Sequence, residues 1–98
     1  SHLTDGMLLR LNNPPPASAF FAGWNAKPLN ANDAITGIHH PAGDSKMVST
    51  GQTRSINTNV TRVGWLSGTT EGGSSGSGLF SIGTKGYVLR GGLWRGDA

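Results

Sequence analysis

Small residues dominate one stretch of the sequence, and they surround two adjacent serines. Residues 69–80 read TTEGGSSGSGLF, a glycine- and serine-rich loop that leads into an apolar run. Such a loop lets the backbone turn tightly with its N–H groups in one concavity, and it exposes a serine hydroxyl without crowding an incoming acyl group. Those are the requirements of a serine nucleophile with an oxyanion hole. The same composition is typical of a flexible turn without chemistry, and composition alone favours that second interpretation.

Histidine is the usual partner that activates a serine, and the chain has three histidines. His2 lies in residues 1–4, which we interpret as a tag scar or N-terminal remnant. His39 and His40 are adjacent, and together with Asp44 they have the residue types of a metal site. Neighbouring residues of a strand point to opposite faces, however, so adjacent histidines rarely bind one ion together. We therefore expect hydrogen-bonding roles for both, and we predict no metal and no cofactor.

Composition excludes several classes of function. The 98 residues carry eight basic and five acidic side chains, and the basic ones are scattered, so we expect no nucleic-acid interface and only a weak basis for binding an acidic partner. The absence of cysteine excludes disulfides, thiolate metal sites and a cysteine nucleophile. No apolar stretch approaches the ~20 residues that span a bilayer, so we expect no membrane partner.

Short strands must position these residues, because the 16 glycines and five prolines interrupt the chain too often for a helical apolar stripe. We expect an all-β domain. Its predicted parts are strands at 7–11, 19–24 and 34–39, a proline-rich linker at 12–16, a half-buried strand at 54–65, and a hairpin of 78–82 with 86–90 around the three-residue loop 83–85. In the fourth strand Ile56, Thr58 and Val60 alternate with polar residues, and the phase change predicts a bulge or break near Arg62.

The segment GSSGSG at 73–78 resembles the nucleophile loop of chymotrypsin-fold serine endopeptidases, and most closely that of the bacterial lysyl-endopeptidase-like group. The resemblance implies that Ser75 is the nucleophile and that the backbone N–H groups of Gly73 and Ser75 form the oxyanion hole. Two positions depart from the family pattern. Ser74 stands where the commoner form has Asp, which removes the usual ion pair with a new N-terminus, and Gly78 stands where Pro is usual.

Other segments follow the same family in order over about residues 4 to 96. The stretch DGMLLRL at 5–11 is similar to the one that holds the triad aspartate, which implies that Asp5 orients the base. The segments FAGW at 21–24, IHHPAGD at 38–44 and VLRGGL at 88–93 also resemble family segments. The resemblance implies a substrate-binding region at Thr69, Leu93 and Trp94. Thr69 occupies the position, six before the nucleophile, where trypsin-like enzymes carry an acid, and Asp97 is a weak substitute.

The family order of the triad is His, Asp, Ser, and only four residues precede Asp5. We therefore expect a C-terminal-half fragment of a serine endopeptidase: an incomplete second barrel of a chymotrypsin-like double β-barrel, with five or six short antiparallel strands. The expected division is a remnant at 1–4, a strand and linker at 5–18, and the barrel at 19–98. The parent would be a secreted or periplasmic bacterial enzyme that cleaves peptides or proteins, and this chain would be inactive alone. The alternative is a non-catalytic β module. Exposed strand edges would make either form a homo-oligomer.

Overall fold

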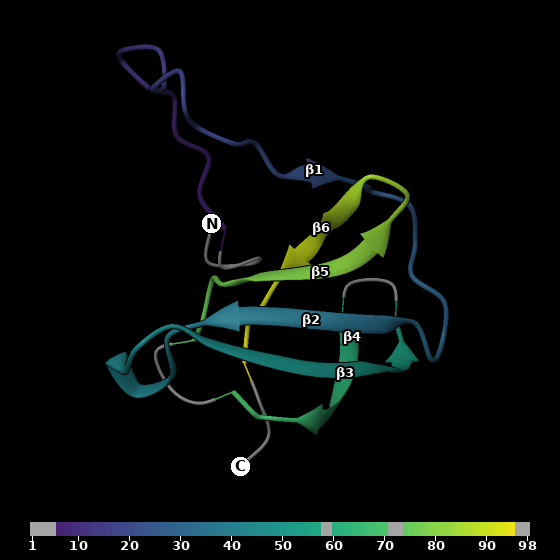
Figure 1. Cartoon of the computed structure of the whole chain (residues 1–98). Coiled ribbons are helices and arrows are strands. Elements are labelled where there is room, and N and C mark those ends of the chain that lie inside the picture. The colour runs from purple at the N-terminus through teal and green to yellow at the C-terminus, as the bar shows by residue number, and fades with distance from the viewer. Residues whose placement is uncertain (1–5, 58–59, 71–73, 96–98) are drawn as a thin grey trace.

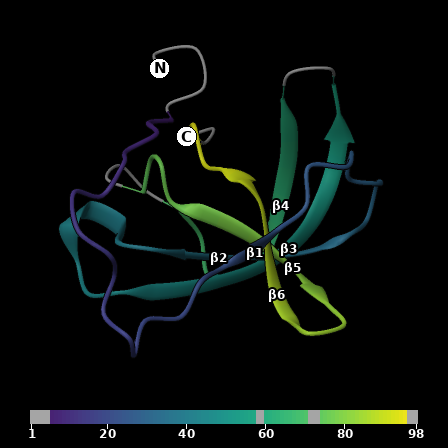
Figure 2. The ribbon, with the colours of Figure 1, turned by 90° about the horizontal axis from the view of Figure 1, so that it is seen from above.

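The computed structural model describes residues 6–57, 60–70 and 74–95. The described residues form one six-stranded sheet in the order β1-β6-β5-β2-β3-β4 (Figure 1). The strands are β1 (Gly23–Trp24), β2 (Ala34–His39), β3 (Met47–Ile56), β4 (Thr61–Ser67), β5 (Gly78–Gly83) and β6 (Gly86–Gly92), and a single 3-10 turn spans Pro41–Gly43. The sheet is coiled, so that its strands run in widely different directions when seen from above (Figure 2). The all-β prediction with six short strands is confirmed, and the described sheet is open.

Strand pairing is antiparallel except at one edge. The two-residue strand β1 pairs with β6 in parallel, whereas β2–β3, β2–β5, β3–β4 and β5–β6 are antiparallel. A parallel neighbour cannot be reached by a tight turn, and here the long chain between Trp24 and Gly86 provides the connection. The prediction of antiparallel strands was thus wrong for β1.

The predicted strand at 34–39 is confirmed as β2, but the hairpin of β5 and β6 is tighter than predicted. Gly83 pairs with Gly86, so the loop holds only Thr84 and Lys85 rather than three residues. Gly86 has φ 116°, a conformation that glycine adopts at no steric cost. Neither Thr84 nor Lys85 has a positive φ, so the connection is a type I-like turn followed by Gly86 in a left-handed conformation, the pattern of a glycine bulge.

The segment predicted as one strand at 54–65 is in fact two strands. β3 ends at Ile56 and β4 begins at Thr61. The ladder shifts register where Ser55 pairs with Arg62, which confirms the predicted irregularity near Arg62. The predicted phase was also wrong: Ser49, Gly51 and Thr53 are buried, whereas Ile56 and Val60 are exposed. The ladder between β3 and β4 shifts register twice, near Thr50 and near Thr53, and such irregularities change which side chains face inward.

The N-terminal arm, residues 6–22, contains no strand. The strand predicted at 7–11 is not formed, and of the strand predicted at 19–24 only Gly23–Trp24 pairs. Apolar side chains on this arm face solvent, and Leu8 and Phe20 are 98% and 99% exposed. An apolar run becomes a strand only when another strand pairs with it, and no described strand pairs with this one. The division at residues 4 and 18 remains a prediction.

Polar side chains make up most of the buried interior. Ile35 is the only buried hydrophobic residue among the described ranges, and it is accompanied by His39, Ser49, Thr53 and Ser74. Thr53 Oγ1 donates to the Asn30 carbonyl at 2.5 Å and accepts the Asp33 N–H at 2.9 Å. Buried polar groups are stable only when they are hydrogen-bonded, and one of them, His39, is hydrogen-bonded to Ser74 of the serine-containing loop.

Candidate active site

Ser75 lies at the exposed corner of a tight turn. The N–H of Ser77 donates to the carbonyl of Ser74 at 3.1 Å, and Gly76, the third residue of this turn, has φ 81°. A positive φ at that position is the requirement of a type II turn and explains the glycine. The N–H of Gly76 donates to the Leu93 carbonyl at 2.7 Å, and the N–H of Leu93 donates to the Ser77 carbonyl at 2.9 Å. The turn is therefore fastened to the chain that follows β6.

The hydroxyl of Ser75 donates to the carbonyl oxygen of Trp94 at 3.2 Å. The predicted substrate-binding residues Leu93 and Trp94 thus lie beside the predicted nucleophile. The guanidinium of Arg95 stacks over the Trp94 ring at 4.6 Å from its centroid, within the range of a cation–π interaction. No imidazole of the described residues is hydrogen-bonded to Ser75.

Ser74, the residue before the predicted nucleophile, points inward. Its Oγ lies 2.9 Å from Nδ1 of His39, and Nε2 of His39 lies 3.0 Å from Oγ of Ser49. Ser49 in turn donates to the Thr69 carbonyl at 2.8 Å. Ser49 could not be predicted from the sequence because it lies in the part of β3, Met47–Ile56, that precedes the strand predicted at 54–65. The departure from Asp at Ser74 was noted, but nothing in the sequence paired it with His39.

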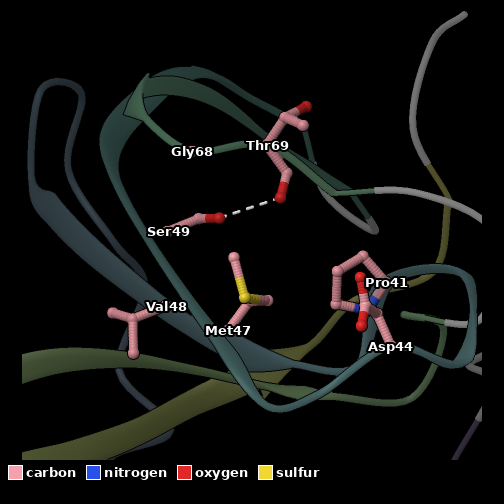
Figure 3. A pocket seen from close by; sticks show the side chains of 7 residues that line it. All are labelled: Pro41, Asp44, Met47, Val48, Ser49, Gly68 and Thr69. Atoms are coloured by element: carbon pink, nitrogen blue, oxygen red, sulfur yellow. Dashed lines mark hydrogen bonds between the residues drawn. The ribbon is translucent and has the colours of Figure 1, made fainter.

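Thr69, the third predicted substrate-binding residue, lies at the other end of this hydrogen-bonded chain (Figure 3). It borders a hollow of about 240 Å³ that is lined by Pro41, Asp44, Met47, Val48, Ser49, Gly68 and Thr69. Gly68 has φ 77°, and a Cβ there would lie 2.6 Å from Ser49 Oγ. Glycine is therefore required at position 68, where the segment that follows β4 approaches Ser49 of β3 closely. Thr69 is connected to Ser74 through Ser49 and His39, and it has no hydrogen bond with Ser75.

His40 is exposed, and its Nδ1 lies 3.1 Å from the Asp44 carbonyl. The two adjacent histidines thus have separate partners, and no group of three metal-ligating side chains exists in the part of the chain that the structure describes. Within those same ranges no helix is long and apolar enough to cross a membrane. Asp5, Gly73 and Asp97 lie outside the described residues, so the roles predicted for them remain predictions.

Comparison with known proteins agrees with the resemblance in the sequence. The family model described as lysyl endopeptidase, C-terminal domain, matches residues 1–98. A curated relative, the lysyl endopeptidase of Pseudomonas aeruginosa, is 44% identical over 101 residues, which cover 96% of this chain and 22% of the relative. No solved structure matches. The chain thus spans about a fifth of the curated relative that it matches, and it belongs to the family of lysyl endopeptidase C-terminal domains.

Proposed function

We propose that this chain is the nucleophile-bearing part of a serine endopeptidase, with Ser75 as the residue that becomes acylated. The exposed position of Ser75 on a fastened turn is the observation that carries the proposal. In the reaction, Ser75 Oγ attacks the peptide carbonyl while its proton passes to a base. The same proton then leaves with the departing amine, and water hydrolyses the resulting ester. The N–H groups of Ser75 and Gly73 are the proposed donors to the oxyanion.

The base is proposed to come from a part of the parent enzyme outside these 98 residues, with Asp5 orienting it. Two observations support this. His39 and His40 both have partners other than Ser75, and the curated relative is more than four times as long as its matched segment. The isolated chain is therefore proposed to be inactive. The parent is proposed to be a secreted or periplasmic bacterial enzyme that cleaves after lysine, by analogy with the name of the relative.

A fluorophosphonate probe tests this proposal, because an activated serine displaces fluoride from phosphorus and retains the phosphonyl group. We expect no adduct on the isolated chain or on its Ser75→Ala variant by intact mass. A chimera in which this chain replaces the matching 101 residues of the Pseudomonas relative should gain one adduct, located at Ser75 by peptide mapping. A folded chimera without an adduct, or an adduct that persists after Ser75→Ala, would refute the proposal.

A second candidate function, self-association through a non-catalytic module, is supported by the exposed surface. The accessible surface is 7807 Å², whereas a compact monomer of 10.2 kDa exposes roughly 5,300 Å². The excess is larger than the ~800 Å² that one partner buries in a standard interface. Large apolar side chains contribute to it, among them Leu8, Phe20, Phe21 and Trp24. Either the rest of the parent or a second copy of this chain would cover such a surface.

Light scattering on the isolated chain measures its mass in solution, and hence whether copies of the chain associate through that surface. We expect a mass of two or more chains at micromolar concentration, because Leu8 and Phe20 of the arm are large apolar side chains that face solvent. Replacing Leu8 and Phe20 together by serine should lower the mass toward one chain, and Thr84→Ser is a control at an exposed loop position. A monomeric mass for the unaltered chain would count against self-association and leave the parent enzyme as the covering partner.

A further inference from the structure

We infer that His39 is a positioning residue for the proposed nucleophile: its imidazole fixes Ser74, and through it the turn that presents Ser75. The inference rests on the proposed function of Ser75 for its catalytic meaning, and on hydrogen-bond geometry for its structural content. His39 and Ser74 are each 2% exposed, and Ser49 is 1% exposed. These side chains come from the end of β2, from the serine-containing loop and from β3.

For a ring that carries one proton, the hydrogen bonds specify where each proton lies. A carbonyl oxygen only accepts, so the Ser49 hydroxyl must donate its proton to Thr69. Ser49 Oγ can then only accept from His39, which requires a proton on Nε2. In the neutral ring Nδ1 is consequently unprotonated, and it accepts the hydroxyl proton of Ser74. The tautomer of His39 with its proton on Nε2 therefore satisfies the hydrogen bonds that join Thr69, Ser49 and Ser74.

The imidazole ring of His39 connects both sides of the loop, Thr69 before it and Ser74 at its end. The Thr69 carbonyl is bound through Ser49, and the Ser74 side chain is bound directly. The carbonyl of Ser74 also accepts the Ser77 N–H that closes the turn, so the orientation of Ser74 determines where the turn begins. Ser75 is the next residue along. A shift of about 1 Å in a reacting group can cost about 100-fold in rate, which is why such a support matters.

The hydrogen bonds among His39, Ser49 and Ser74 indicate that His39 orients its neighbours rather than only filling the interior. An apolar residue at His39 would fill the interior without needing partners, whereas three buried polar groups stay stable only if each is satisfied. In the commoner form of the loop that this segment resembles, the residue before the nucleophile is an aspartate, which forms an ion pair. Here the residue before the proposed nucleophile is fixed by a hydroxyl rather than a carboxylate, through the contact of Ser74 Oγ with Nδ1 of His39.

The test uses the full chain and does not depend on catalysis. Long-range ¹⁵N–¹H spectra should show a proton on Nε2 of His39 and none on Nδ1. Amide hydrogen exchange should then show that Ser74→Ala accelerates Gly76 and Ser77 about tenfold, the effect of losing one good hydrogen bond. The Thr53 amide, which donates to the Asp33 carbonyl, should be unchanged. General destabilisation would instead accelerate all three amides together.

A distant variant separates orientation from local packing. Ser49→Ala removes the acceptor of Nε2–H, and we expect it to accelerate the Gly76 and Ser77 amides about threefold although Ser49 lies on β3. Ser55→Ala is the matched control, because Ser55 lies exposed on the same strand. The double variant Ser49→Ala with Ser74→Ala should be no faster than Ser74→Ala alone, since both act through one ring.

Two results would overturn the inference: a proton on Nδ1, or loop amides that Ser74→Ala leaves unchanged. The proposed function fails separately, if the chimera acquires no adduct at Ser75. An adduct with unchanged loop exchange would keep Ser75 and discard His39. Faster loop exchange without an adduct would keep His39 as the support of a loop that is not catalytic.

Discussion

Ser75→Ala in the chimera with the Pseudomonas relative is expected to lower kcat for peptide hydrolysis by about 10⁶-fold, the loss found when the nucleophile of a triad is removed. KM should change little, because the hydroxyl of Ser75 contributes to bond making rather than to uniform binding of the substrate. Steady-state hydrolysis of a lysine-containing peptide measures both constants. The residual rate should still exceed the uncatalysed rate, since the oxyanion donors and binding contacts remain.

Ser77→Ala is the matched control for that experiment. It makes the same chemical change two residues away, and its buried hydroxyl has no hydrogen-bond partner among the described residues. Removing a hydroxyl that makes no hydrogen bond is close to neutral for stability, so kcat should stay within about twofold. Equal losses from Ser75→Ala and Ser77→Ala would indicate damage to the loop rather than loss of the nucleophile.

Gly51→Ala is expected to destabilise the isolated domain by about 3 kcal/mol or more, the upper range for overpacking. A Cβ at Gly51 would overlap the Gly64 carbonyl oxygen and would lie 2.9 Å from Trp65 Cα. These are backbone atoms of β4, so no side-chain rotation relieves the contact. Because small domains are stable by only about 5–15 kcal/mol, the variant should unfold at much lower urea concentration.

Tryptophan fluorescence during urea unfolding measures this loss, with Gly91→Ala as the control. Gly91 lies in β6, and a Cβ there would meet no atom within 4 Å. A substitution without such a contact is expected to change stability by about 0.5 kcal/mol or less. If Gly51→Ala unfolded at the same urea concentration as the unaltered chain, the close approach of β3 and β4 would be incorrect.

The sequence was most informative where a local pattern determines the structure. The bounds of β2 could be predicted because Pro41 stops the strand, and the turn around Ser75 could be predicted because Gly76 tolerates a positive φ. The pairing of His39 with Ser74 and Ser49 could not, because it joins residues 35 and 10 positions apart in the chain. Such contacts depend on strand register, here the pairing between β2 and β3 that sets Gly37 opposite Ser49 and His39 opposite Met47.

The same limit explains the largest errors in the predicted strands. The apolar residues of the arm suggested a strand at 7–11, but strand propensity mainly reflects packing against neighbours, and the described sheet offers none there. In β3, the apolar side chain of Ile56 suggested the inward phase, whereas the structure buries Thr53 instead. The hydroxyl of Thr53 binds the turn at residues 30–33, and that turn is distant in sequence.

An interior with one buried hydrophobic residue among the described positions also has a calorimetric consequence. The heat capacity of unfolding rises with newly hydrated apolar area and falls with newly hydrated polar area. A domain with so few apolar side chains inside therefore has a small heat-capacity increment for its size, and its stability changes little with temperature around the optimum. Burial of the exposed arm against a partner would restore the missing increment, so association and folding would be distinguishable by their heat-capacity changes alone.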